Sequence, residues 1–180
     1  MEIRLDQIVD EPFEWSESRS IGADSLDSRQ LVRLSEVSWE GRVSPLESGH
    51  LLQARLRYEQ VLECPRCLAT AGRPVDVEFE YLVVPRAGEP MVGEIELDEE
   101  DLGVLYVSEP HLDAEPLLLE QLQLNIPMRP LCREDCAGLC PVCGANRNDG
   151  ECGCATESPD PRWSGLAALR DQIDGDQIDD

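Results

Sequence analysis

The sequence predicts an α+β fold: an antiparallel, partly barrel-like sheet packed by one long helix, with a C-terminal zinc-binding appendage and a short terminal helix. Two observations lead to this prediction. Much of residues 37–83 alternates between apolar and polar side chains, the period of a half-buried strand. The eight cysteines form four close pairs, and six of them lie within residues 132–154 among glycines that interrupt any long helix or strand.

Strands are expected before and after the first cysteine pair. The alternation is most regular in residues 50–62 and 75–83, and residues 13–15, 38–43 and 103–107 predict shorter strands. The turn Cys64-Pro65-Arg66-Cys67 should therefore lie at the tip between two antiparallel strands, where zinc knuckles are commonly found.

Two helices are expected in the second half of the chain. Asp113 can cap the first, with Pro116 in its first turn, and this helix should end before Pro127. Its apolar side chains recur at helical spacing and predict a face packed on the sheet: Leu118, Leu119, Leu122 and Ile126. A shorter helix should begin at Asp160, and the aspartate-rich tail after it predicts disorder.

These elements suggest three segments. We expect an α+β sheet domain over residues 1–128, a zinc-knuckle segment packed on it over 129–156, and a short helix with an acidic disordered tail over 157–180.

Composition indicates the compartment and the charge of a partner. The first residues show no basic and apolar leader, and no apolar run reaches the length of a membrane span, so a cytoplasmic protein with no membrane contact is expected. The net charge is −23 and every one of the 15 cationic side chains is arginine. Such a charge favours basic protein partners and repels nucleic acid, although an acidic surface can also be merely solvated.

The cysteine spacing predicts two zinc ions, each held by four thiolates, because a reducing compartment favours metal over disulfides. The favoured pairing is Cys64, Cys67, Cys132 and Cys136 at one site, and Cys140, Cys143, Cys152 and Cys154 at the other. In the main competing arrangement, Cys64 and Cys67 share a site with Cys140 and Cys143. A single zinc with spare thiols is the third arrangement, and structural disulfides are a further one.

The same residues argue against an enzyme. A site filled by four thiolates has no open position for substrate, and the only histidines, His50 and His111, lie far from any cysteine in sequence. Dithiol chemistry at Cys64-Pro65-Arg66-Cys67 would need a helix immediately after the motif, whereas a strand is expected there. No catalytic residues are predicted.

Several arginines lie near the cysteines in sequence. Phosphate contacts at the zinc sites are one interpretation, and compensation of thiolate and neighbouring carboxylate charge is the other. The candidate contacts with RNA or with a partner are Arg66, Arg129, Arg133 and Arg147.

The motif Cys132-x3-Cys136-x-Gly-Leu-Cys-Pro-x-Cys-Gly-x-Asn146, with Cys64-Pro65-Arg66-Cys67, Cys152-Gly153-Cys154 and Asp160-Pro161-Arg162-Trp163, resembles the YceD family of large ribosomal RNA subunit accumulation proteins. The resemblance covers most of the chain, and only the N-terminal third matches loosely. Arg147 departs from the family's usual Asn-Leu-Asn. The resemblance implies a cytoplasmic factor needed for 23S rRNA to accumulate or be processed, with no agreed catalytic residues to transfer.

The resulting hypothesis is a non-catalytic ribosome biogenesis factor. We expect it to assist large ribosomal subunit assembly by binding a basic ribosomal protein. The alternative is a zinc protein that binds rRNA directly through the arginines near its cysteine clusters. A processing nuclease is the third hypothesis, and no defensible two-metal carboxylate cluster in the sequence supports it. The sequence leaves the oligomeric state open.

Overall fold

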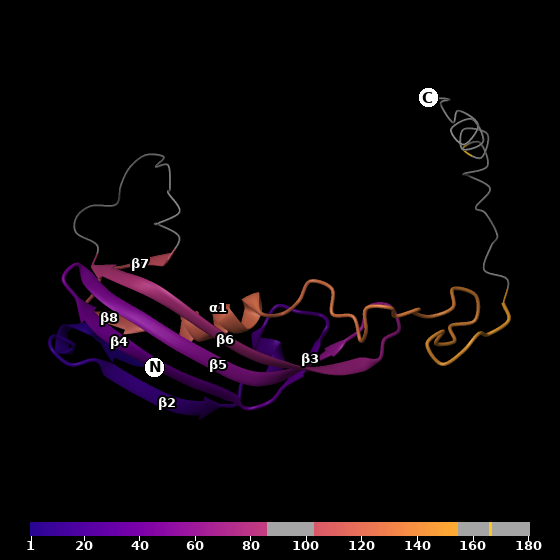
Figure 1. Ribbon diagram of the computed structural model, residues 1–180, viewed down its shortest axis with the longest axis horizontal. Coiled ribbons are helices and arrows are strands. Elements are labelled where there is room, and N and C mark those ends of the chain that lie inside the picture. Colours follow the sequence, from indigo (N-terminus) through magenta and orange to yellow (C-terminus); the bar gives the residue numbers. More distant parts are fainter. Residues whose placement is uncertain (86–102, 155–165, 167–180) are drawn as a thin grey trace, which may run out of the picture. The chain divides into compact units, whose positions relative to one another are not determined.

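The computed structural model describes residues 1–85, 103–154 and 166. The chain divides into two compact units, Met1–Glu134 and Asp135–Asp180. The first unit contains the sheets and the helix labelled in Figure 1. In the second unit, the described residues 135–154 form turns and one isolated bridge, between Leu139 and Asn146.

The main sheet of the first unit has six strands (Figure 1). Four pair antiparallel in the order β2 (Phe13–Arg19), β4 (Val37–Leu46), β5 (Gly49–Glu63) and β6 (Thr70–Pro85). A fifth, β3 (Leu31–Leu34), pairs antiparallel with the end of β5. The sixth, β7 (Val104–Val107), pairs with β6 in parallel. The predicted strands before and after the first cysteine pair are thus present, and β5 and β6 form one long hairpin.

The sheet is open, so the predicted barrel-like closure is wrong. β2 and β7 lie at opposite ends of the strand order. β7 is only four residues long and pairs with Leu82–Pro85 at the end of β6. So short a strand covers only one end of the β6 edge, and a barrel would require the edge strands to pair along their length. The parallel pairing of β6 and β7 also departs from the expected antiparallel sheet.

Alternation along the strands separates a core face from a solvent face. On β5, Leu52 and Leu56 are buried, whereas the residues that follow them, Gln53 and Arg57, are exposed. Directly paired residues share a face, so Trp39 of β4 lies beside Leu56 and is 1% exposed. The register therefore places the apolar rows of β4 and β5 on one side, as the period-2 pattern predicts.

Helix α1 (Glu115–Leu124) packs in this core, with Leu118 and Leu122 fully buried. Pro116 occupies its first turn, as expected. The cap differs from the prediction, because Ala114 is the N-cap residue. Asp113 still contributes, since its carboxylate accepts a 3.1 Å hydrogen bond from the backbone N–H of Glu115.

Two short strands and two single turns are the remaining elements among the described residues of the first unit. β1 (Glu2–Arg4) pairs antiparallel with β8 (His111–Asp113), and 3-10 turns span Leu5–Gln7 and Ala23–Ser25. The predicted terminal helix and acidic tail lie almost entirely outside the described residues, as does the acidic run at 94–101. Among the described residues, no helix has the length and apolar character needed to cross a membrane.

Candidate metal centres

The first pair of thiols lies at the tip of the β5–β6 hairpin, as the sequence predicts. β5 ends at Glu63 and β6 begins at Thr70, which leaves Cys64 and Cys67 in the connecting turn. The backbone N–H of Cys64 donates to the carbonyl of Ala69 at 2.9 Å, and the N–H of Leu68 donates to the carbonyl of Cys64 at 2.8 Å. Leu68 adopts a φ of +60°, the left-handed conformation needed to close this turn.

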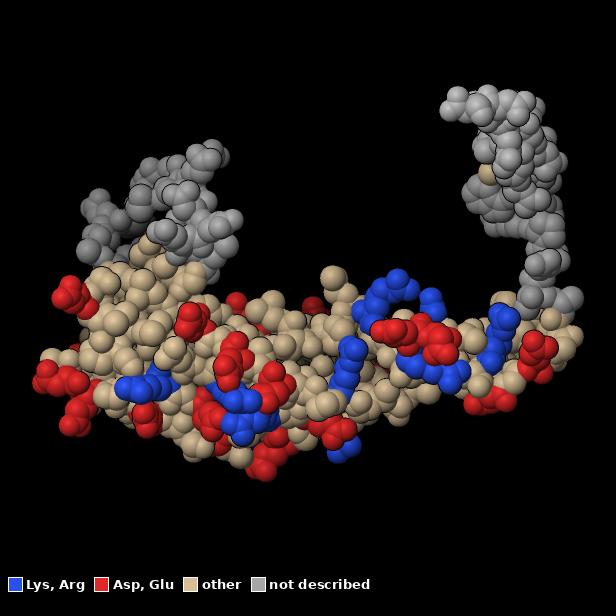
Figure 2. Space-filling view, viewed as in Figure 1, with Lys and Arg blue, Asp and Glu red and all other residues tan. Residues whose placement is uncertain are grey.

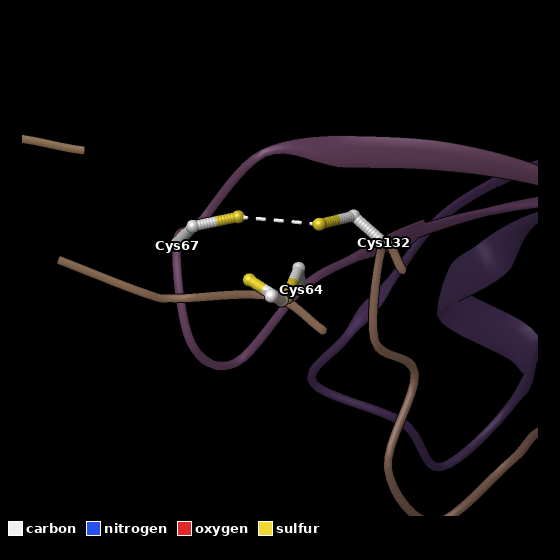
Figure 3. Close-up of side chains that lie close together, drawn as sticks. Cys64, Cys67 and Cys132 are labelled. Carbon is white, nitrogen blue, oxygen red and sulfur yellow. Dashed lines mark hydrogen bonds between the residues drawn. The ribbon is translucent and has the colours of Figure 1, made fainter. Parts of the chain in front are cut away.

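This turn belongs to a group of four cysteines. Figure 3 shows the side chains of Cys64, Cys67 and Cys132 converging, and the sulfur atoms of Cys67 and Cys132 are 3.5 Å apart. With Cys136, all the sulfur atoms lie within 4.8 Å of one another. Four thiolates bound tetrahedrally to zinc at about 2.3 Å have sulfurs about 3.8 Å apart. The donor set therefore fits one tetrahedral cation.

The second group lies entirely in the second unit. The sulfurs of Cys140, Cys143, Cys152 and Cys154 also lie within 4.8 Å of one another. Its first turn repeats the hydrogen bonds of the hairpin tip. The N–H of Cys140 donates to the carbonyl of Ala145 at 2.8 Å, and the N–H of Gly144 donates to the carbonyl of Cys140 at 2.9 Å. Gly144 has a φ of +75°, so the two turns share one backbone design.

Backbone N–H groups prepare both turns for anionic sulfur. Burial by itself would raise the pKa of the Cys64 thiol. N–H groups of Cys132, Cys67 and Arg66 hydrogen-bond the sulfur and lower its pKa to about 6. At Cys140, the N–H groups of Cys143 and Val142 lower the thiol pKa to about 6 in the same way.

Crowding of thiols has the opposite effect on the last cysteine of the second group. Hydrogen bonding with Cys143 and Cys152 raises the pKa of the Cys154 thiol to about 12. A fourth thiolate beside others is unfavourable unless a cation shares their charge. The pattern is that expected of a site that a metal ion would complete.

An asparagine that the sequence analysis did not single out supports the second unit. The side-chain amide of Asn148 donates to the sulfur of Cys136 at 3.4 Å, and its oxygen accepts the backbone N–H of Ala137 at 2.8 Å. The same amide donates to the side-chain oxygen of Asn146 at 2.8 Å. The available signal was the Asn-x-Asn spacing directly after the second turn.

Three of the four candidate arginines lie in the first unit. Arg129 and Arg133 line a surface hollow of about 280 Å³, and Arg66 lies exposed in the hairpin turn. The structure adds Arg73 of β6, which lines the same hollow and was not among the candidates. Arg147 lies exposed in the second unit. Figure 2 shows blue side chains gathered over the region where the hairpin ends.

The site thus defines a class: a cysteine-rich α+β protein with two closed four-thiol groups. The family model described as "Large ribosomal RNA subunit accumulation protein YceD" matches residues 52–170, and the chain belongs to this YceD family. The grouping of the cysteines is the favoured one of the sequence analysis, whereas occupation by zinc stays a prediction.

Individual relatives extend this result. An uncharacterised Mycobacterium bovis protein is 34% identical over 128 residues, 71% of this chain and 59% of the relative. One from Mycobacterium leprae is 28% identical over 133 residues, 74% of this chain and 58% of the relative. The chloroplastic large ribosomal RNA subunit accumulation protein YCED homolog 1 of Arabidopsis thaliana is 32% identical over 62 residues, 34% of this chain and 19% of the relative.

The chain spans about three fifths of the length of the mycobacterial relatives that it matches. The comparison with solved structures gave no match.

Proposed function

We propose that this chain is a non-catalytic cytoplasmic factor that supports 23S rRNA accumulation and large ribosomal subunit assembly by binding a basic ribosomal protein. The family's description as large ribosomal RNA subunit accumulation proteins is the observation that carries the proposal. The name of the Arabidopsis relative agrees with it. The net charge of −23 supports a basic partner.

The binding surface we propose is the solvent face of β2, β4, β5 and β6. Carboxylates outnumber arginines on this face: Glu14, Glu40, Asp76, Glu78 and Glu80 lie among Arg42, Arg55 and Arg57. A shallow hollow of about 540 Å³ opens between them.

The arginines of this face already form ion pairs. Arg55 contacts Asp76 at 2.6 Å and Glu78 at 2.9 Å, and Arg57 pairs with Glu40. Such exposed pairs contribute only about 0.2–1 kcal/mol each, so a basic partner can replace them at small cost. The basic side chains of the partner would neutralise the surplus carboxylates. Ribosomal RNA would then compete for the same basic side chains and displace this chain.

In this proposal the two cysteine groups hold zinc and have a structural role. Four thiolates fill the coordination sphere, so no ligand position is open for substrate or for an activated water. Zinc at the first group would join the hairpin tip to the segment that follows α1. We therefore assign the metal to folding, and the surface to binding.

Capture of ribosomal proteins tests the proposal. The metal-loaded chain is immobilised and exposed to dissociated large-subunit proteins at physiological salt, and bound proteins are identified by mass spectrometry. We expect enrichment of a basic ribosomal protein, reduced by E78Q/E80Q on the proposed face and retained by E109Q/E120Q, which changes the charge equally elsewhere. Recovery of bare RNA alone, or equal capture by both double variants, would contradict the proposal.

A second candidate is direct binding of rRNA through arginines. The gathering of Arg129, Arg133 and Arg73 around one hollow favours it. It predicts salt-dependent binding of rRNA fragments that weakens when Arg66, Arg133 or Arg147 is replaced by Ala. An affinity for rRNA fragments that is unchanged by these substitutions would contradict direct binding through the arginines.

A further inference from the structure

One hollow of the first unit is lined by Arg73 and Arg129. It lies where β6 begins and where the chain runs from α1 toward Cys132. Its lining also includes Arg133 and one carboxylate, that of Glu134. Cationic side chains therefore outnumber acidic ones here, although the chain as a whole carries a charge of −23.

Neither Arg73 nor Arg129 has a counter-ion in the described part of the chain, where no hydrogen bond or ion pair engages either guanidinium group. The arginines of the solvent face of the sheet behave differently. Arg42, Arg55 and Arg57 all pair with carboxylates. In a protein so rich in acidic residues, two unpaired arginines at one hollow are not explained by compensation of the protein's own charge.

The position of Arg73 has no packing explanation either. Arg73 pairs with Gln60 in the β5–β6 register, and Gln60 is 2% exposed on the core face of the sheet. Two residues further along each strand, the next pair is Leu62 with Ala71, which also line the hollow. Strand alternation calls for an apolar side chain at position 73. The sequence places an exposed guanidinium there instead.

Arg129 is held in place by its neighbours. The side-chain amide of Gln60 donates to the carbonyl of Asn125 at 3.1 Å, which fixes the chain directly after α1. Pro127 and Pro130 flank Arg129, Pro130 is buried, and the N–H of Leu131 donates to the carbonyl of Arg129 at 2.9 Å. Proline restricts the backbone, so the guanidinium is presented with little loss of chain entropy on binding.

We propose that this hollow is an oxyanion site that binds a phosphodiester group of single-stranded RNA, with Arg73 and Arg129 as the principal contacts. A guanidinium group can donate two parallel hydrogen bonds to two oxygens of one phosphate, and it is more weakly hydrated than the ammonium group of lysine. A cavity of about 280 Å³ accommodates a phosphate and its flanking sugar atoms but not a folded domain. The choice of RNA as the phosphate source rests on the proposed role in 23S rRNA accumulation and on the second candidate function, direct binding of rRNA.

RNA binding by the metal-loaded full chain tests the site. Anisotropy of a fluorescent single-stranded RNA oligonucleotide gives the affinity of wild type, of R73Q/R129Q and of R29Q/R33Q. The control pair lowers the net charge equally, and its exposed arginines likewise have no partner among the described residues and do not line the hollow. We expect R73Q/R129Q to bind about tenfold more weakly, as the loss of charge-assisted hydrogen bonds implies. The control should lose less than about threefold.

Salt dependence provides a second readout. If both arginines contact phosphates, the slope of log affinity against log salt should fall by about 1.4 in R73Q/R129Q, since each contact on a single strand contributes about 0.7. R73K/R129K keeps the two positive charges but loses the paired donors of the guanidinium groups. It should therefore retain most of the wild-type salt slope but bind RNA more weakly than wild type. Equal losses in the hollow and control variants, or an unchanged slope, would overturn the proposal.

Two competitors distinguish the source of the anion. Inorganic phosphate is compared with chloride at equal ionic strength and with unlabelled oligonucleotide as competitors of the labelled RNA. If phosphate displaces the RNA better than chloride does, and at a lower concentration than the unlabelled oligonucleotide, the site belongs to free phosphate. Polyglutamate that binds as tightly as RNA would assign it to an acidic protein. Either result overturns the assignment to RNA. Capture of a basic ribosomal protein should be unchanged in R73Q/R129Q, so loss of the proposed function and loss of this site are separable.

Discussion

Loss of one cysteine from each group should have different effects on the sheet. The first group closes a long loop, because the sulfurs of Cys67 and Cys132 lie 3.5 Å apart across 65 residues. A cross-link over that length lowers the conformational entropy of the unfolded chain, which stabilises the folded state by about 4 kcal/mol at 25 °C. Typical domains are stable by about 5–15 kcal/mol, so C67A should leave the sheet marginally stable. C143A breaks a group confined to the second unit and should leave the sheet's unfolding nearly unchanged.

Urea unfolding followed by tryptophan fluorescence measures this difference. Trp39 is 1% exposed and contacts Trp15 edge-on at 5.5 Å between ring centroids, so both report on the sheet. Trp163, the third tryptophan, belongs to the second unit, and W163F in every sample removes its signal. Native mass spectrometry of the same samples should count two zinc ions in wild type and one in each cysteine variant.

Either of two results would contradict a stabilising role of zinc at the hairpin tip. A wild-type chain purified from a zinc-supplied reducing cell without bound metal would remove the basis of the comparison. Equal destabilisation of the sheet by C67A and C143A would show that loop closure at the hairpin tip is not what stabilises it. A matched C67S variant checks that the effect comes from the lost ligand and not from the packing of the buried thiol.

Two further predictions concern the sheet unit. L118A removes a fully buried side chain of α1 and should lower the free energy of unfolding by about 2–5 kcal/mol, whereas L124A, at a position 67% exposed, should change it by less than about 0.5 kcal/mol in a urea titration. Arg55 lowers the pKa of Asp76, so the stability from this pair is present at neutral pH and lost as the pH falls through the depressed pKa of the folded state. In a plot of the urea unfolding midpoint against pH, D76N should therefore reduce the fall in the midpoint below about pH 4. A fall identical to that of wild type would contradict the assignment.

The parts of the fold that were predicted correctly rest on local patterns. Alternation over residues 50–62 identified the buried side of β5, and Leu118 and Leu122 at helical spacing identified the buried side of α1. The cysteine groups were also predictable. A Cys-x2-Cys turn holds two thiols near one point, and the remaining pairs could be combined in only a few ways.

The parts that were missed depend on contacts between distant segments. Barrel closure could not be judged from sequence, because it depends on how far β7 extends along the edge of β6. The pairing of β1 with β8 joins residues 2–4 to 111–113, and three-residue strands have no periodicity to detect. Arg73 lies near a cysteine pair in sequence but was not chosen as a candidate contact, because its role arises only from the hollow that it lines together with Arg129, 56 positions later in the chain.

The distribution of ion pairs explains how so acidic a chain could contact RNA. Repulsion from a net charge of −23 weakens non-specific association with phosphates over the whole surface. Any RNA contact must then come from cations that the protein's own carboxylates do not neutralise. On the solvent face of the sheet, Arg42, Arg55 and Arg57 are neutralised by ion pairs. Arg73 and Arg129 are not neutralised by any described residue, and unlike the likewise unpaired Arg29 and Arg33 they line one hollow. RNA affinity should therefore depend on this pair far more than on the total number of arginines.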